Sequence, residues 1–215
     1  MREPFVALIP VNRLDRAKGR LAEVLAADQR QQLTLATTRT VIEAVVRAGG
    51  HPVVLTADAT VERQVRDTSE ILHEEPGRHG LNGQIEYARE VLACDELLLL
   101  HADLPLATGE AIQALVEGAP PPPSATITRS GDGGTNALFL RPPGLFPLRY
   151  GPDSAELHRQ AAHAARVVIS FRAEPALKLD LDTPADIEAL MEFDPRGETR
   201  AGHLLRTWGI TGKLA

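Results

Sequence analysis

The chain has 215 residues, of which 43% are hydrophobic and 24% charged, and its formal net charge is −6 at pH 7. This length and composition suit one globular α/β domain with a core large enough to fold unaided. The acidic balance argues against nucleic acid or an anionic membrane as the main partner, and no apolar run reaches the roughly 18 residues of a membrane span. The single cysteine excludes an intrachain disulfide, and the N-terminal residues show no signal-peptide pattern, so we expect a cytoplasmic protein.

The first 105 residues alternate apolar runs with segments of helical periodicity. Asp28 is a suitable N-cap for a helix that Gly49-Gly50 would end. Alternation of this kind is typical of a mostly parallel sheet with helices on both faces. We expect strands at 5–11, 51–56, 70–73 and 97–100, and helices at 29–48, 58–66 and 81–93.

The second half of the chain is patterned less regularly. The proline-rich spacer 118–124 is too short to separate two domains, so we treat 1–215 as a single domain. Residues 192–215 are a weakly patterned C-terminal tail, and Trp208 is the side chain expected to dock it. We expect helices at 108–117, 154–165 and 183–191, and strands at 125–128, 137–140, 166–171 and 177–181.

A basic loop follows the first predicted strand. Residues 10–21 read PVNRLDRAKGRL and include Lys18 and Arg20. A loop after the first strand of a doubly wound sheet is a common phosphate site, and these cations would neutralise a triphosphate. The loop matches neither a Walker motif nor G-x-G-x-x-G, which disfavours a P-loop NTPase and a dinucleotide-dependent oxidoreductase. A solvated basic loop is the alternative interpretation.

A second glycine-containing stretch, residues 80–83 with the sequence GLNG, begins a predicted helix. Glycines at a helix start allow backbone N–H groups to approach a ligand. Asn82 offers a donor and an acceptor, as needed to bind a base or a ribose. The alternative is an ordinary N-cap by Asn82.

Acidic residues follow two predicted strands. Asp103 comes after the four leucines 97–100, and Asp180 and Asp182 alternate at the end of the predicted strand 177–181, on one face. Ligands in open α/β sheets bind outside the carboxyl ends of strands. Carboxylates from two strands can share one Mg²⁺ ion, with phosphate oxygens and waters as further ligands. Alternatively, Asp103 starts a turn and Asp182 precedes a helix cap.

Two further stretches could bind anions. Residues 133–136, GGTN, are suited to form an anion nest, or simply a hairpin turn. Residues 150–154, YGPDS, precede a predicted helix with His158 one turn later, and a helix start suits a carboxylate or phosphate, although an ordinary capped helix explains the pattern as well. The other histidines have no metal-ligand spacing, so zinc is not expected.

In this combination and order, the residues resemble the 2-phospho-L-lactate / phosphoenolpyruvate guanylyltransferase family of deazaflavin coenzyme (coenzyme F-420) biosynthesis. The chain departs from the family pattern at Asn12, where lysine is usual, at 127–130, where Ala-Pro-Asp-Arg is usual, and at 83–84. The resemblance covers about 5–190, and the segments that carry it are 10–11, 17–21, 80–82, 102–106, 134–138, 141–143, 151–154 with His158, and 179–186.

The resemblance implies a Rossmann-like nucleotidyltransferase sheet of the nucleotide-diphospho-sugar transferase type. It also implies that GMP passes from GTP, the co-substrate, to a phosphorylated three-carbon acid, with Mg²⁺ and with release of pyrophosphate. The implied site residues are Lys18 and Asp103 for catalysis; Pro10, Lys18, Arg20, Gly80 and Asn82 for the nucleotide; Thr135, Gly151 and Ser154 for the acceptor acid; and Asp103, Asp180 and Asp182 for the metal.

The expected reaction is an in-line attack of the acceptor phosphate on the α-phosphorus of GTP. Because a phosphate is already ionised at neutral pH, no general base is required. Two alternatives stay open: another nucleotidyltransferase of this fold, of the molybdenum-cofactor or sugar-nucleotide type, and a non-catalytic nucleotide-binding module. The expected partners are small-molecule substrates, a homodimer is left open, and the sequence does not select the acceptor acid.

Overall fold

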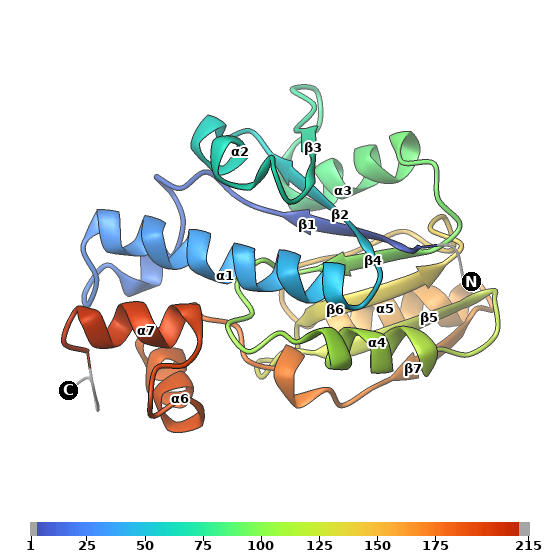
Figure 1. The fold of residues 1–215 in the computed structure, drawn as a ribbon. Helices are drawn as coiled ribbons and strands as arrows, with labels where there is room; N and C mark the ends of the chain where they lie inside the picture. Colours follow the sequence, from blue (N-terminus) through green and yellow to red (C-terminus); the bar gives the residue numbers. More distant parts are fainter. Residues whose placement is uncertain (1–3, 211–215) are drawn as a thin grey trace.

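A seven-stranded sheet with the strand order β3-β2-β1-β4-β6-β5-β7 lies at the centre of the fold (Figure 1). The computed structural model describes residues 4–210. The strands are β1 (Val6–Pro10), β2 (His51–Thr56), β3 (Glu70–His73), β4 (Leu97–Leu100), β5 (Ser124–Arg129), β6 (Thr135–Arg141) and β7 (Val168–Phe171). The α-helices are α1 (Ala27–Arg47), α2 (Ala59–Val65), α3 (Gly80–Val91), α4 (Gly109–Glu117), α5 (Ser154–Ala164), α6 (Pro184–Phe193) and α7 (Arg200–Thr207), and two 3-10 turns are η1 (Gly19–Leu21) and η2 (Pro175–Leu177).

Six of these strands run in one direction, and β6 runs antiparallel to both of its neighbours, β4 and β5. The prediction of a mostly parallel sheet is therefore confirmed. Strand β4 pairs with β1 on one side and with β6 on the other. Because β1 and β4 are parallel neighbours, the loops that follow their carboxyl ends lie at the same edge of the sheet, which is where such folds bind ligands.

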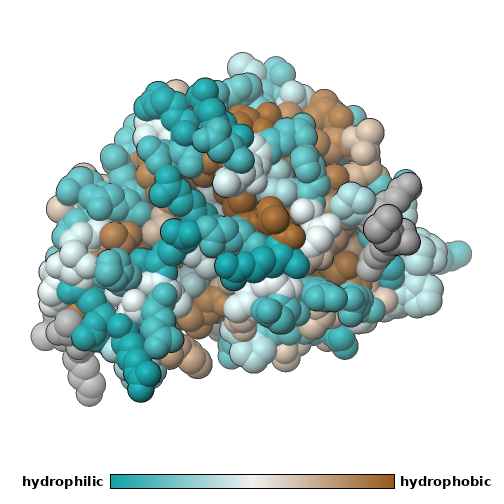
Figure 2. Space-filling view, in the orientation of Figure 1, coloured by the Kyte–Doolittle hydropathy of each residue, from teal (hydrophilic) through white to brown (hydrophobic). Residues whose placement is uncertain are grey.

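Helices cover both faces of the sheet, as the alternation of the sequence predicted. Helices α1, α2 and α4 pack on one face, where Leu98 and Leu100 point, and α3 and α5 pack on the other, where Leu97 and Leu99 point. All four leucines are at most 1% exposed, so β4 is buried on both faces. The outer surface of α1 and α2 is mostly hydrophilic (Figure 2), and no helix among residues 4–210 is long and apolar enough to cross a membrane.

The C-terminal segment is more ordered than predicted. Helix α7 forms within the expected tail, with the Thr199 hydroxyl as its N-cap, and it buries Ala201 and Leu205 in an apolar cluster with α1 and α6. Trp208 packs against this cluster, as expected. The helix has only eight residues and a short apolar face, which was not recognised in the sequence. The last five residues of the predicted tail, 211–215, lie outside the described residues.

The predicted strand 177–181 is wrong. The segment contains the turn η2 and then an irregular stretch, because Leu177 and Leu181 are buried in two different apolar clusters instead of on one face of a sheet. A single backbone bond, from the Leu181 N–H to the Asp103 carbonyl (3.0 Å), ties this stretch to the loop after β4. Helix α1 also begins at Ala27 with Ala26 as its N-cap, so Asp28 lies in its first turn.

Candidate active site

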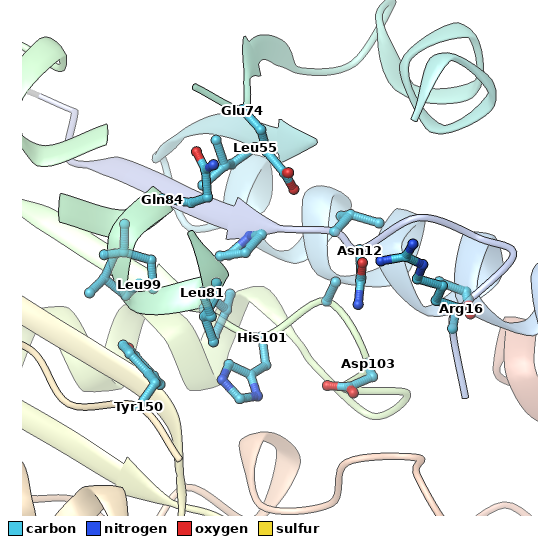
Figure 3. Close-up of a pocket in the computed structure, with 18 of the residues that line it drawn as sticks. Asn12, Arg16, Leu55, Glu74, Leu81, Gln84, Leu99, His101, Asp103 and Tyr150 are labelled. Carbon is cyan, nitrogen blue, oxygen red and sulfur yellow. The ribbon is translucent and has the colours of Figure 1, made fainter. Parts of the chain in front are cut away.

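A cavity of about 580 Å³ opens at the carboxyl ends of β1 and β4 (Figure 3). Its base contains apolar side chains of the sheet and of α3, among them Leu55, Leu99 and Ile85. Its rim is polar and comes from five loops and the start of α3. The residues of the rim include Asn12, Arg16 and Lys18 after β1, Glu74, Arg78 and His79 after β3, Gly80 and Leu81 of α3, His101 and Asp103 after β4, and Tyr150 and Asp182 from later segments.

The ammonium group of Lys18 lies between two carboxylates at one end of this cavity. Its Nζ atom is 3.7 Å from Asp103 Oδ2 and 3.7 Å from Asp182 Oδ1, and it donates a hydrogen bond to the Leu181 carbonyl. The Lys18 side chain is only 4% exposed. Its backbone is in the left-handed region, with φ of 53°, which costs a non-glycine residue of the order of 1 kcal/mol. The fold therefore holds this cation in one place at a conformational cost, as is common at functional sites.

Two of the predicted aspartates, Asp103 and Asp182, contact this cation, and the third, Asp180, lies near both of them. Burial and then the charge of Asp103 raise the pKa of Asp180 to about 6. The same two effects raise the pKa of Asp182, whereas Lys18 and Arg20 act to lower it. The three carboxylates therefore repel one another, and a cation near them would be stabilised.

The position of Asp182 is set by the helix that follows it. Thr183 is the N-cap of α6, with Pro184 in the first turn, as the sequence predicted. The Asp186 carboxylate accepts hydrogen bonds from the backbone N–H groups of Asp182 (3.0 Å) and Thr183 (2.7 Å). This capping box fixes the backbone that carries Asp182, so the carboxylate is oriented by local structure and not by a strand.

A divalent cation would fit these residues only with help from substrate. Among residues 4–210, no three His, Cys, Asp or Glu side chains form a group that could hold a metal by themselves. Asp103 Oδ1, however, is buried and accepts no hydrogen bond from the described residues. Because Mg²⁺ is usually bound by one or two carboxylates together with phosphate oxygens and waters, an incomplete carboxylate set of this kind is compatible with it.

Of the residues expected at the nucleotide, the structure places Pro10, Lys18 and Gly80 in the cavity wall. Arg20 is exposed in η1, and its charge acts on Asp182, so it lies on the side of the aspartates. Asn82 does not line the cavity: its side-chain amide bonds both the N–H and the carbonyl of Tyr150, at 2.7 and 2.9 Å. In the structure the Asn82 amide is therefore paired with protein backbone.

The residues expected at the acceptor acid form a buried hydroxyl cluster next to the cavity. Thr135 and Ser154 are each 1% exposed, and Ser154 Oγ donates to Thr135 Oγ1 at 3.0 Å. Thr135 Oγ1 is also 3.2 Å from Nδ1 of His158, a fully buried ring. Gly151, with φ of +138°, makes the turn that leads to α5. These side chains lie together as predicted, but they are packed against one another.

The loop after β3 was not among the expected site residues, and Tyr150 was expected only as the first residue of the possible anion-binding stretch 150–154. Figure 3 shows the Glu74 carboxylate directed into the cavity and Tyr150 beside His101. Tyr150 and His101 have ring centroids 5.7 Å apart, and the Tyr150 hydroxyl is buried without a hydrogen-bond partner among the described residues. Glu74 directly follows a predicted strand, a position that could have identified it, whereas Tyr150 follows a proline-rich loop with no such signal.

The buried ring of His158 is expected to make the protein sensitive to acid. Burial lowers its pKa to about 4, so between pH 6.5 and 4 the unfolded chain binds a proton that the folded chain does not. The free energy of unfolding should therefore fall over this range, by roughly 3 kcal/mol from this group. Urea unfolding at several pH values measures it. In His158→Gln this part of the slope should vanish, and an unchanged slope would contradict the assignment.

The fold and the site together define a nucleotidyltransferase: a cavity lies outside a parallel sheet, with a buried lysine and acidic residues at one end. Known structures share this fold. The chain superimposes with a TM-score of 0.80 and 18% identity on a protein from Desulfovibrio desulfuricans G20 described as a nucleotide-diphospho-sugar transferase, covering 96% of this chain and 95% of that one. For a nucleotidyl transferase from Methanothermobacter thermautotrophicus the TM-score is 0.64 at 16% identity, with 96% and 100% covered.

Sequence comparison identifies the family within this class. The model of the family "Guanylyl transferase CofC like" matches residues 5–214, and the chain belongs to this family. The phosphoenolpyruvate guanylyltransferase of Rubrobacter xylanophilus is 38% identical over 88% of this chain and 97% of that protein. The 2-phospho-L-lactate guanylyltransferase of Methanothermobacter thermautotrophicus is 31% identical over 96% of this chain and 92% of that protein.

Proposed function

We propose that this protein transfers GMP from GTP to a phosphorylated three-carbon acid, phosphoenolpyruvate or 2-phospho-L-lactate, in the biosynthesis of coenzyme F-420. The observation that carries the proposal is the placement of Lys18 between Asp103 and Asp182 at one end of the cavity. The names of the relatives support both the nucleotide and the two acceptors. In the reaction, an oxygen of the acceptor phosphate bonds to the α-phosphorus of GTP, the bond to the β-phosphate breaks, and pyrophosphate leaves.

The basic groups after β1 would bind the triphosphate. Both reactants are anionic, so charge repulsion is the main barrier and fixed cations lower it. We assign Lys18 and Arg20 to the triphosphate and the departing pyrophosphate. The nucleoside would occupy the cavity between Pro10 and Gly80, whose apolar base offers a surface for a purine ring.

We assign Asp103, together with Asp182 and Asp180, to a Mg²⁺ ion that enters with the nucleotide. When bound there, the ion would supply positive charge that neutralises the anionic reactants. The unpartnered oxygen of Asp103 and the raised pKa values of Asp180 and Asp182 support this assignment. The carboxylates contribute ligands and orientation, and they need not transfer a proton.

The acceptor acid would bind at the amino end of α5. The positive end of a helix dipole favours an anion, and Gly151 and Ser154 belong to the turn that begins α5. Thr135 lies beside Ser154, so its hydroxyl is the third group that we assign to the acid.

An assay with a panel of substrates tests the proposal. We expect pyrophosphate release and a guanylylated product, detected by mass spectrometry, when GTP is combined with phosphoenolpyruvate or 2-phospho-L-lactate, and much less with 3-phosphoglycerate, sugar 1-phosphates or other nucleotides. Turnover with a sugar phosphate or a molybdopterin acceptor in place of these acids would indicate another branch of the fold. Binding of GTP without pyrophosphate release from any acceptor would contradict catalysis.

A further inference from the structure

The loop between β6 and α5 is held by side chains where backbone pairing is absent. The N–H of Arg149 donates to His158 Nε2 at 3.0 Å, and the N–H of Tyr150 donates to Asn82 Oδ1 at 2.7 Å. Backbone donors removed from water need partners, so the side chains that supply them determine where the loop lies. Here those side chains belong to α5 and α3, the two helices on this face of the sheet.

Asn82 makes the closest of these contacts. Its Nδ2 atom donates to the Tyr150 carbonyl at 2.9 Å while its Oδ1 accepts the Tyr150 N–H, so one amide pairs with both backbone groups of one residue. One turn later on α3, Glu86 Oε1 accepts the N–H of Leu148 at 3.3 Å. The first two turns of α3 therefore hold a loop that lies more than 60 residues away in the sequence.

This loop carries both a wall of the cavity and the turn that we assign to the acceptor. The Tyr150 ring lines the cavity and packs between His101 and His158, with centroid distances of 5.7 and 5.0 Å. The backbone then turns through Gly151 and reaches Ser154 at the start of α5. A shift of the Tyr150 backbone would therefore move the acceptor turn.

The same loop also determines which groups of the hydroxyl cluster donate hydrogen bonds and which accept them. Because the Arg149 N–H can only donate, His158 Nε2 must accept, which assigns the ring proton to Nδ1. Nδ1 then donates to Thr135 Oγ1, which also accepts from Ser154. With both of its acceptor positions occupied, the Thr135 hydroxyl retains only its proton, and so it can serve an anion as a donor.

We propose that Asn82 is a positioning residue for the acceptor acid: it fixes the Tyr150 loop against α3 and does not contact the nucleotide. The proposal rests on the proposed function, because it takes the turn after Tyr150 to bind the acceptor. It reverses the sequence-based expectation, in which the Asn82 amide binds the base or ribose.

Gln84, two residues further along α3, provides a matched contrast. Its Oε1 accepts the Glu75 N–H at 2.9 Å, and its Nε2 donates to the carbonyls of Glu75 (2.8 Å) and Arg78 (2.7 Å). It therefore holds the loop after β3, which forms the opposite rim of the cavity. One helix thus fixes two loops through two neighbouring amides. Asn82 holds the loop that leads to the acceptor turn, and Gln84 holds the loop after β3, which lines the cavity that we assign to the nucleoside. Removing each amide should therefore affect a different substrate.

Steady-state kinetics of Asn82→Ala and Gln84→Ala test this separation. In Asn82→Ala we expect the KM for the acceptor to rise about 10–100-fold, since a small displacement of a binding group has effects of this size, while the KM for GTP stays within about twofold. In Gln84→Ala we expect the KM for GTP to rise instead. A raised KM for GTP with an unchanged acceptor KM in Asn82→Ala would overturn the proposal, as would an equal loss for both substrates.

Hydrogen exchange of the backbone amides tests the contact without turnover. The amides of Arg149 and Tyr150 should exchange about tenfold faster in Asn82→Ala and at the wild-type rate in Gln84→Ala. Unchanged exchange in Asn82→Ala overturns the proposal even if the wild-type enzyme is active. If the wild type shows no turnover with any acceptor, the proposed function fails, and the exchange result still decides the role of Asn82. Should Asn82→Ala not fold, Asn82→Asp, which keeps the acceptor for the Tyr150 N–H, should show a smaller effect in the same direction.

Discussion

Asp103→Asn is expected to reduce guanylyl transfer by about 10³-fold, the size of effect seen when a group that stabilises transition-state charge is removed. The substitution keeps the shape of the side chain but removes its charge beside Lys18, 3.7 Å away, and weakens the oxygen that we assign to Mg²⁺. Pyrophosphate release with GTP and either acceptor acid measures the loss.

The fold should survive this substitution. The Asp103 side chain is 25% exposed, and its backbone bond to Leu181 does not involve the carboxylate. Loss of one charge also reduces the repulsion on Asp180 and Asp182. The midpoint of thermal unfolding should therefore equal or exceed that of the wild type. Asp95→Asn, an exposed residue near the other end of β4, is the matched control and should retain full activity. Transfer at the wild-type rate in Asp103→Asn would remove Asp103 from the mechanism.

Lys18→Met is the second substitution with a large expected effect. It replaces a buried ammonium by an apolar group of similar length and leaves Asp103 and Asp182 facing each other without a cation. We expect turnover to fall by about 10²–10³-fold and the KM for GTP to rise, because the triphosphate loses a fixed positive charge.

Lys18→Met should also lower stability, in contrast to Asp103→Asn. Removing one partner of a buried ion pair costs about 3–5 kcal/mol, but Asp182 is 45% exposed, so solvent screening reduces the expected loss to roughly 1 kcal/mol. Urea unfolding at pH 7 measures this loss. Lys178→Met, on an exposed side chain, controls for the change from Lys to Met. If Lys18→Met kept both its stability and its KM for GTP, the central position of this cation in the site would be wrong.

Much of the fold could be predicted because its signals are local. Four consecutive leucines leave water only if both faces of the segment are buried, and this predicted that β4 is a central strand. Strand-helix alternation indicated parallel neighbours, and the order of short motifs indicated the family. Two elements were missed for different reasons. Helix α7 is short, and its apolar face of Ala201, Leu205 and Trp208 was not recognised, whereas Leu177 and Leu181 enter separate clusters and follow no strand period.

The sequence predicted which kinds of residue the candidate site contains, but it did not predict how these residues are arranged in space. The residue types around Lys18, Asp103 and Asp182 follow from the chemistry of phosphates, and the ends of β1 and β4 located two of them. The third reaches the site from an irregular stretch that one backbone bond ties to Asp103. Contacts across such sequence distances depend on packing, so no local pattern reports them.

The sequence by itself therefore determined the class of fold, the central strand and the kinds of side chain that meet a phosphorylated substrate, because periodicity and residue chemistry are properties of short segments. Only the tertiary structure decided that Lys18 lies between two carboxylates, that Asp182 belongs to a helix cap, and that Asn82 pairs with Tyr150. These facts depend on which distant segments the core brings together. A side-chain amide such as that of Asn82 bonds the polar groups that the fold places next to it, and the sequence alone does not show which groups these are.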